Sequence, residues 1–191
     1  MASIFGHAAL GFGLSKISQK KTTGTIILLC IFCTVIPDAD VLMFFFGVPY
    51  ESAFGHRGFT HSIFFALDLG LLISLLFCRK KNYSIQKRIG FFLLFFICTL
   101  SHGLLDAMTT EGGLGVAFFF PFDNSRYYFP FRPIRVSPIG VSGFFSKWGL
   151  AVLKSEAIWI GIPSLVLVII RMIINFFTKK ETEKDLLSSQ K

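Results

Sequence analysis

Residues 89–106 read IGFFLLFFICTLSHGLLD, an apolar run that ends in a histidine and an aspartate. At about 1.5 Å per residue the run is about 27 Å long as a helix, close to the ~30 Å hydrocarbon core of a bilayer. The whole chain has the same character: 53% of its 191 residues are hydrophobic, 25 are phenylalanine and the mean hydropathy is +0.66. This composition predicts an integral membrane protein rather than a soluble domain.

Other apolar runs surround this segment and approach membrane-spanning length. They are Ala2–Leu14, Thr22–Ile36, Ser62–Cys78 and Ala157–Phe177. We therefore expect an all-α fold: an integral membrane helical bundle of about four to five helices, with a long outer loop at residues 109–155. Residues 1–177 form a single domain in this interpretation, and residues 178–191 form a polar cytoplasmic tail. Asp68, inside the 62–78 run, is expected to be a buried hydrogen-bond partner between helices.

The basic residues indicate how the bundle is oriented. About two thirds of the 19 Lys and Arg residues lie at helix ends on one side of the predicted bundle. The positive-inside rule assigns this side to the cytoplasm, so the N-terminus and the long loop face out. The net charge of +8 does not predict a nucleic-acid partner, because the basic residues flank apolar runs instead of forming a stripe with interleaved aromatics. The oligomeric state is left open.

The histidines and several carboxylates fall at one depth. Counted from the basic helix ends, they all lie in the outer third of the membrane. Ionisable groups at that depth are expensive unless they are paired, bind a metal or line a wet cavity. We therefore predict one site, built from all four histidines and four carboxylates. The set is His7, Asp38, Asp40, His56, His61, His102, Asp106 and Glu156.

Three short motifs carry most of this set. In SHGLLD (101–106) the histidine and the aspartate are four residues apart, on one helix face. In PDAD (37–40) the proline is expected to end a helix, so that both carboxylates bend inward from a turn. In HRGFTHS (56–62) Gly58 permits a tight backbone and Thr60 is the expected cap of the next helix. Each motif alone is also typical of a helix-surface pair, a helix stop or a capped loop, and only their common depth favours a site.

The ligand types indicate which ion would bind. Histidine and carboxylate ligands without cysteine suit zinc, with manganese or iron as alternatives, better than calcium or a thiolate cluster. Such an ion activates water near neutral pH, and a pair of ions would also clamp the oxygens of a phosphoester. Glu51 and Glu111 belong to the outer loops and are left out of the ligand set.

Several motifs together resemble a known family. GHAALGFG (6–13), PDAD, HRGFTHS, SHGLLDAMTTEGG (101–113) and FPFRPI (129–134) resemble the bacterial membrane-bound metal-dependent hydrolases, some of which are described as regulated by the repressor LexA. That family is similar, more distantly, to zinc-dependent phospholipases C. The resemblance implies the bacterial inner membrane and a set of metal ligands, with Glu156 matched only by its position at a helix start. These ligands are His7, Asp38, His56, His61, His102, Asp106 and Glu156.

The expected function follows from the site and the resemblance together. We expect a membrane-bound metal-dependent hydrolase that cleaves a phosphoester of a lipid or lipid-linked substrate by metal-activated water, on the extracytoplasmic side. Asp38 and Asp40 are the candidates for general base or for positioning carboxylate. Guanidinium groups match phosphate oxygens, which gives Arg57 a catalytic role. The expected substrate-binding residues are Arg126, Arg132 and Arg135.

Two other classes of protein remain as alternatives. One is a metal-binding membrane protein that acts as a transporter or as a structural component without hydrolase activity. A transporter would need polar residues that continue to the cytoplasmic side, and below the outer third the sequence offers only Asp68 and scattered Ser and Thr. The other is an intramembrane metalloprotease, which would need an HExxH motif that the sequence lacks.

Overall fold

The computed structural model describes residues 1–17, 22–110 and 112–189. Glu111 and the last two residues of the expected tail lie outside these ranges. Apart from two isolated β-bridges, the regular structure of the described residues is helical, which confirms the all-α prediction. The elements in chain order are α1 (Ile4–Ile17), α2 (Gly24–Val35), η1 (Ile36–Phe46), η2 (Phe59–His61), α3 (Ile63–Cys78), α4 (Ile85–Ala107), α5 (Val141–Phe144), α6 (Lys147–Glu156), η3 (Ala157–Gly161) and α7 (Ile162–Ser189).

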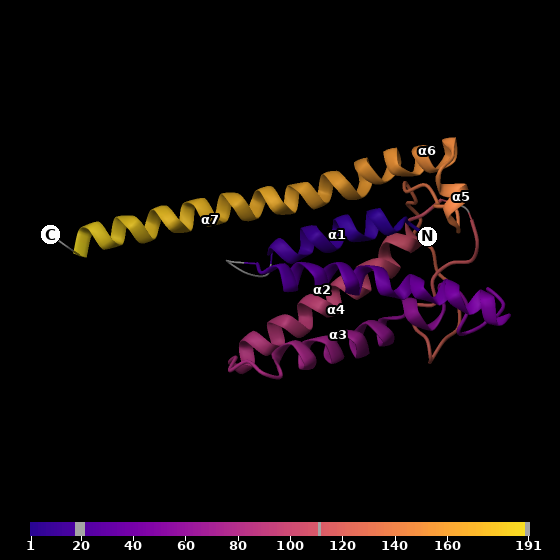
Figure 1. The fold of residues 1–191 in the computed structure, drawn as a ribbon, viewed down its shortest axis with the longest axis horizontal. Coiled ribbons are helices and arrows are strands. Elements are labelled where there is room, and N and C mark those ends of the chain that lie inside the picture. Colours follow the sequence, from indigo (N-terminus) through magenta and orange to yellow (C-terminus); the bar gives the residue numbers. More distant parts are fainter. Residues whose placement is uncertain (18–21, 111, 190–191) are drawn as a thin grey trace.

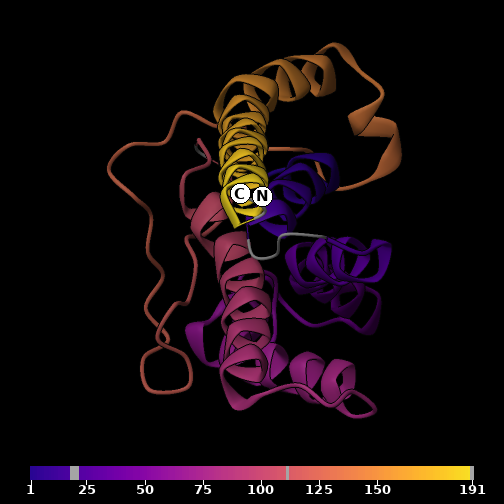
Figure 2. The same cartoon turned by 90° about the vertical axis from the view of Figure 1, so that its left-hand side faces the viewer.

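The long helices run side by side (Figure 1). Within the described residues, three helical segments are long and apolar enough to cross a membrane: Gly24–Phe46, Ile85–Ala107 and Lys147–Lys179. The apolar α3 is shorter and packs antiparallel to α4. Seen from the far end of α7, α4 lies in the middle of the bundle and α7 packs on α1 (Figure 2). This arrangement confirms a membrane bundle whose outer faces are apolar.

Small residues allow the helices to approach closely. A Cβ at Gly70 of α3 would lie 2.7 Å from the backbone nitrogen of Phe96 in α4, and a Cβ at Gly11 of α1 would lie 2.5 Å from Thr34 Oγ1 in α2. Membrane helices rely on such contacts because lipid tails are as apolar as the helix faces. One half of the bundle is thereby filled by an apolar core. Its buried members are Ile26, Cys30, Cys33, Cys78, Phe91, Leu94, Phe95 and Cys98.

The helix after PDAD does not end as expected. The chain passes from α-helix to 3₁₀-helix at Ile36 and stays helical to Phe46, with Pro37 at the first turn of the 3₁₀ segment. Proline has no N–H to donate, which is harmless at a helix start, and the tighter 3₁₀ turn continues the helix from there. Asp38 and Asp40 therefore project from a helix and not from an irregular turn.

The cap of α3 is also a different residue from the one expected. Ser62 Oγ accepts a hydrogen bond from Phe65 N at 3.0 Å, which is the N-cap interaction. The Thr60 hydroxyl, which was expected to cap the helix, instead donates to Asp40 Oδ2 at 2.7 Å. Thr60 lies within the short η2 turn, two residues before the cap, so its side chain faces η1.

Two further expectations are wrong in their details. Asp68 is exposed and not buried between helices, because Ala66 and Gly70 form the face of α3 that packs on α4. The expected loop of residues 109–155 is irregular only in its first part and then forms α5 and α6. Ser146 caps α6, since its Oγ accepts from Trp148 N and Gly149 N. The helix α7 runs through Thr178 to Ser189, into the expected tail.

The close contact at Gly70 predicts a large effect of a small substitution. Gly70→Ala places a methyl group against the backbone of Phe96, so α3 and α4 must separate, and we expect a loss of about 1–3 kcal/mol. Gly90→Ala in α4 is the matched control, because a Cβ there meets nothing within 4 Å and alanine favours a helix. Thermal unfolding in detergent measures both variants. Equal midpoints for the two would contradict the packing described here.

Candidate metal centre

The predicted site residues come together at one end of the bundle from several elements. His7 lies on α1, Asp38 and Asp40 on η1, and His102 and Asp106 near the end of α4. His56 and His61 come from the loop and the η2 turn before α3. Their side chains are almost fully buried, except that Asp38 keeps 12% of its side-chain surface accessible. The basic turn between α3 and α4 lies at the opposite end (Figure 1).

Four of these residues form a compact group: Asp38, His61, His102 and Asp106. One ligand atom from each lies within 4.8 Å of all the others. Asp38 Oδ1 is 3.3 Å from His102 Nε2 and 3.5 Å from His61 Nε2, and Asp106 Oδ2 is 3.6 Å from His61 Nε2. Ligands about 2.1 Å from a tetrahedral ion lie about 3.4 Å apart. The spacing of this group therefore suits a single ion of that size.

Hydrogen bonds assign a proton to Nδ1 of both His61 and His102, the ring nitrogen that faces away from the other histidine. His102 Nδ1 lies 2.7 Å from the carbonyl oxygen of Thr34, which only accepts, so Nδ1 is the donor. His61 Nδ1 faces Asp40 Oδ2 at 3.2 Å and the Thr60 hydroxyl at 3.0 Å, and that hydroxyl already donates to Asp40. The two Nε2 atoms then present lone pairs to each other at 2.9 Å. Such a pair is stable only with a proton or a cation between the nitrogens.

The carboxylates around His61 also favour a positive charge at this place. Burial lowers the pKa of His61, but hydrogen bonds and charge from Asp106, Asp38 and Asp40 raise it more, and the net pKa lies well above 6.5. The carboxylates thus favour a positive charge at His61, which a proton on Nε2 supplies in the absence of an ion. A divalent metal ion would supply the same charge in place of that proton and would accept both lone pairs.

Buried polar atoms without hydrogen-bond partners also indicate a site for a metal ion. Among the described residues, neither ring nitrogen of His7 has a hydrogen-bond partner, and neither does Asp38 Oδ1. His7 stacks on His102 with ring centroids 3.8 Å apart, and its Nε2 lies 3.4 Å from Asp106 Oδ1. An unsatisfied buried polar atom costs about 1–3 kcal/mol. Coordination would remove this cost, so the residues present fit a bound metal.

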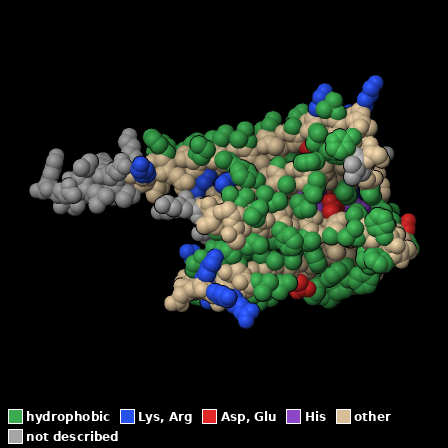
Figure 3. Space-filling view, in the orientation of Figure 1, with side chains coloured by type: hydrophobic (Ala, Val, Ile, Leu, Met, Phe, Trp, Pro, Cys, Tyr) green, Lys and Arg blue, Asp and Glu red, His purple; other side chains and the backbone are tan. Residues whose placement is uncertain are grey.

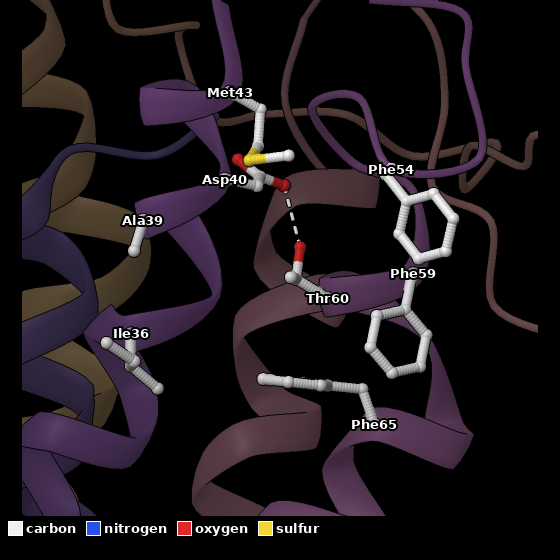
Figure 4. Close-up of a pocket in the computed structure, with 8 residues that line it drawn as sticks. All are labelled: Ile36, Ala39, Asp40, Met43, Phe54, Phe59, Thr60 and Phe65. Atoms are coloured by element: carbon white, nitrogen blue, oxygen red, sulfur yellow. Dashed lines mark hydrogen bonds between the residues drawn. The ribbon is translucent and has the colours of Figure 1, made fainter. Parts of the chain in front are cut away.

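A second group, Asp40, His56 and His61, adjoins the first. Asp40 Oδ1 lies 2.7 Å from His56 Nδ1. Asp40 Oδ2 accepts a hydrogen bond from the Thr60 hydroxyl (Figure 4). It also accepts one from the backbone N–H of Arg57. Burial lowers the pKa of His56, although its bond to Asp40 acts the other way, so the imidazole is neutral at pH 7. Asp40 therefore orients two histidines, as outer carboxylates do in metalloproteins.

Arg57 is buried within the protein and does not face the surface. It has a positive φ of 63° and no accessible side-chain surface. Its Nε donates to Asp106 Oδ2 at 3.1 Å, and its terminal nitrogens donate to Thr109 Oγ1 and the carbonyl of Leu114. In this geometry Arg57 positions Asp106 and the segment after α4, and its guanidinium is engaged by protein groups and not open for a phosphate.

Glu156 lies apart from both groups. Its two carboxylate oxygens accept from the backbone N–H and the hydroxyl of Ser3, the latter at 2.5 Å. A neighbouring bond from Ala2 N to Asp106 Oδ1, at 2.8 Å, ties the N-terminal segment to α4. The structure thus gives Glu156 a role in holding the start of the chain and not a place among the ligand atoms. Counting residues along the predicted helix gave the correct depth for Glu156, but it could not predict the hydrogen bonds to Ser3.

The other arginines have local partners. Arg126 donates to the carbonyls of His56 and Ser52, each at 3.0 Å, and so fastens the loop that carries His56. Arg132 stacks over Tyr128 and Arg135 over Trp148, with distances of 4.9 and 5.4 Å to the ring centroids.

Sequence reasoning missed the polar groups that position the ligands. These are the Thr34 carbonyl, Thr60 and Thr109. Thr60 and Thr109 lie within quoted motifs, but Ser and Thr are common in membrane helices and loops, so their residue type does not mark them as partners of the ligands.

A multi-pass helical membrane protein with a buried cluster of histidines and aspartates at one end is the class that fold and site define. Residues 1–181 match the family model described as YdjM inner membrane protein, and the chain belongs to that family. It is similar to the inner membrane protein YbcI of Escherichia coli K12, with 36% identity over 171 residues, which cover 87% of this chain and 95% of that protein. No solved structure matches.

These comparisons establish the inner membrane as the location of the protein. They bear out the membrane part of the resemblance described above. The names of this family and of YbcI specify neither an activity nor a metal.

The role of Asp40 predicts a weaker but intact site when its charge is removed. Asp40→Asn loses the acceptor geometry that orients His56 and His61, and we expect metal affinity to fall about 10–100-fold. Asp123→Asn is the control, since Asp123 is partly exposed and its carboxylate bonds only to Ser125 and Tyr127 among the described contacts. Competition against a fluorescent zinc chelator measures both variants. Unchanged affinity in Asp40→Asn would contradict the positioning role.

Proposed function

We propose that this protein is a metal-dependent hydrolase that cleaves a phosphoester of a lipid or lipid-linked substrate at the extracytoplasmic face of the inner membrane. One observation carries the proposal: the Nε2 atoms of His61 and His102 converge at 2.9 Å beside the carboxylates of Asp38 and Asp106. Zinc is the ion that suits this ligand set best, with manganese or iron as alternatives.

The residues have separate tasks in this proposal. Asp38, His61, His102 and Asp106 would hold a divalent ion, which would lower the pKa of a bound water to about 7 and polarise a phosphoryl oxygen. Asp38 is the residue that would take the proton of the water, because it is the member of this group whose side chain is partly accessible. Asp40 and Arg57 hold His56, His61 and Asp106 in position.

Orientation of the site is inferred from charge. The turn between α3 and α4 carries several Lys and Arg residues and lies at the opposite end of the bundle from the cluster. Basic loops tend to stay in the cytoplasm, and this supports an orientation with the cluster toward the outside. Arg132 and Arg135 lie on the segment that follows α4 at the cluster end, where their charges favour an anionic headgroup.

A transporter is the weaker candidate. A transport path needs polar side chains that continue across the membrane. Between the cluster and the basic end, the described interior is the apolar core that includes Phe91, Phe95 and Cys98. This packing favours chemistry at one face over passage through the bundle.

Metal content together with hydrolysis tests the proposal. We expect purified wild type to hold one or two zinc, manganese or iron ions by mass spectrometry and to release phosphate or a phosphorylated headgroup from a panel of phospholipids and isoprenoid phosphates. His102→Ala combined with Asp106→Ala removes two of the four ligands and should lose both metal and activity. Asp68→Asn, an exposed intramembrane carboxylate outside the cluster, is the control and should keep both.

The outcomes separate the candidates. Metal in the wild type without hydrolysis of any substrate in the panel would favour the structural or transport role. A wild type without metal under chelator-free conditions would remove the metal centre itself.

A further inference from the structure

An apolar groove runs between α1 and α2. It is lined by Ile4, Phe5 and Ala8 of α1 and by apolar side chains within residues 28–36 of α2 and η1, and its volume is about 530 Å³. Every residue that lines it is apolar. We call it the α1–α2 groove.

One end of the groove adjoins the metal cluster. Ala8 follows His7 directly, and Ile36 lies two residues before Asp38, whose Oδ2 is 3.9 Å from His7 Nε2. Asp38 is also the member of the four-residue group with an accessible side chain. Figure 3 shows acidic and histidine side chains at the surface near this end of the bundle, surrounded by hydrophobic ones. The groove therefore ends beside the segments that carry His7 and Asp38.

We propose that the α1–α2 groove binds one hydrocarbon chain of the lipid substrate, with the phosphoester of that lipid at Asp38. This inference rests on the proposed function and adds to it the place and the direction from which the substrate enters: laterally, from the bilayer.

The direction of the groove matches that of a lipid chain. Residues 28–36 extend about 12 Å along the helix axis, within the membrane-crossing segment Gly24–Phe46. The groove thus leads from the cluster toward the middle of the bilayer, as a chain does from its headgroup.

A second cavity, on the other side of η1, is a poorer candidate. It measures about 300 Å³ and is walled by Met43, Phe54, Phe59 and Phe65 (Figure 4). Its polar end is Asp40, and both oxygens of Asp40 are already bonded to protein groups. That cavity leads to a positioning carboxylate and not to a ligand with a free oxygen.

Photo-cross-linking tests the occupant without relying on catalysis. The full-length protein is placed in nanodiscs of phosphatidylglycerol that contain a small fraction of phosphatidylglycerol with a diazirine at the end of one acyl chain. We expect the label on residues 28–32 of α2. Leu28→Trp, at the inner end of the groove, should reduce this label about fivefold, because the larger side chain occupies the space of the chain end. Leu75→Trp, on the exposed face of α3, is the matched control.

Hydrolysis by the same variants separates this inference from the proposed function. For an active wild type, Leu28→Trp should cleave long-chain substrates more slowly than short-chain ones, with metal content unchanged. Label on residues 28–32 without any hydrolysis would support the groove and overturn the hydrolase. Hydrolysis that is equal in Leu28→Trp and wild type, with label spread evenly over all exposed helix faces or joined to a second copy of the chain, would overturn the groove and leave the hydrolase standing.

Discussion

The buried carboxylate of Asp106 is the constraint on which the rest of the structure depends. A charge in the membrane interior must be compensated, and here the compensation comes from two segments at once. Arg57 and the Ala2 backbone donate to Asp106, and His7 and His61 lie within 3.6 Å of it. These contacts join α4 to two other parts of the chain, the start of α1 and the segment before α3. The same carboxylate thus closes one end of the bundle and assembles the candidate metal centre.

The residues of the cluster differ in how many of their polar atoms have hydrogen-bond partners. Asp40, Arg57 and Thr60 have their polar atoms engaged by one another or by neighbouring ligands, so they fix geometry. Asp38 retains an unpartnered oxygen and some accessible surface beside the α1–α2 groove. A rigid, buried ligand set with a single open edge is the arrangement expected where solvent and substrate must reach an ion from one side only.

Much of this arrangement was predictable, and the errors have physical causes. Apolar runs identified the long helices, and equal depth brought His7, His61, His102 and both carboxylates of PDAD to one end. Glu156 shares that depth, but depth is a single coordinate, and its side chain meets Ser3 instead. Asp68 is exposed because the small residues of α3 select the face that packs on α4.

The sequence by itself determined that this chain enters a membrane and at which level its ionisable residues lie, because apolar length and residue count set both quantities locally. Tertiary structure decided which nitrogen of each histidine is free, since the Thr34 carbonyl and Asp40 come from elements distant in the chain. It also decided that the Arg57 side chain is buried and that the Asp38 side chain remains partly accessible. Those outcomes depend on contacts between segments far apart in sequence, which no local pattern records.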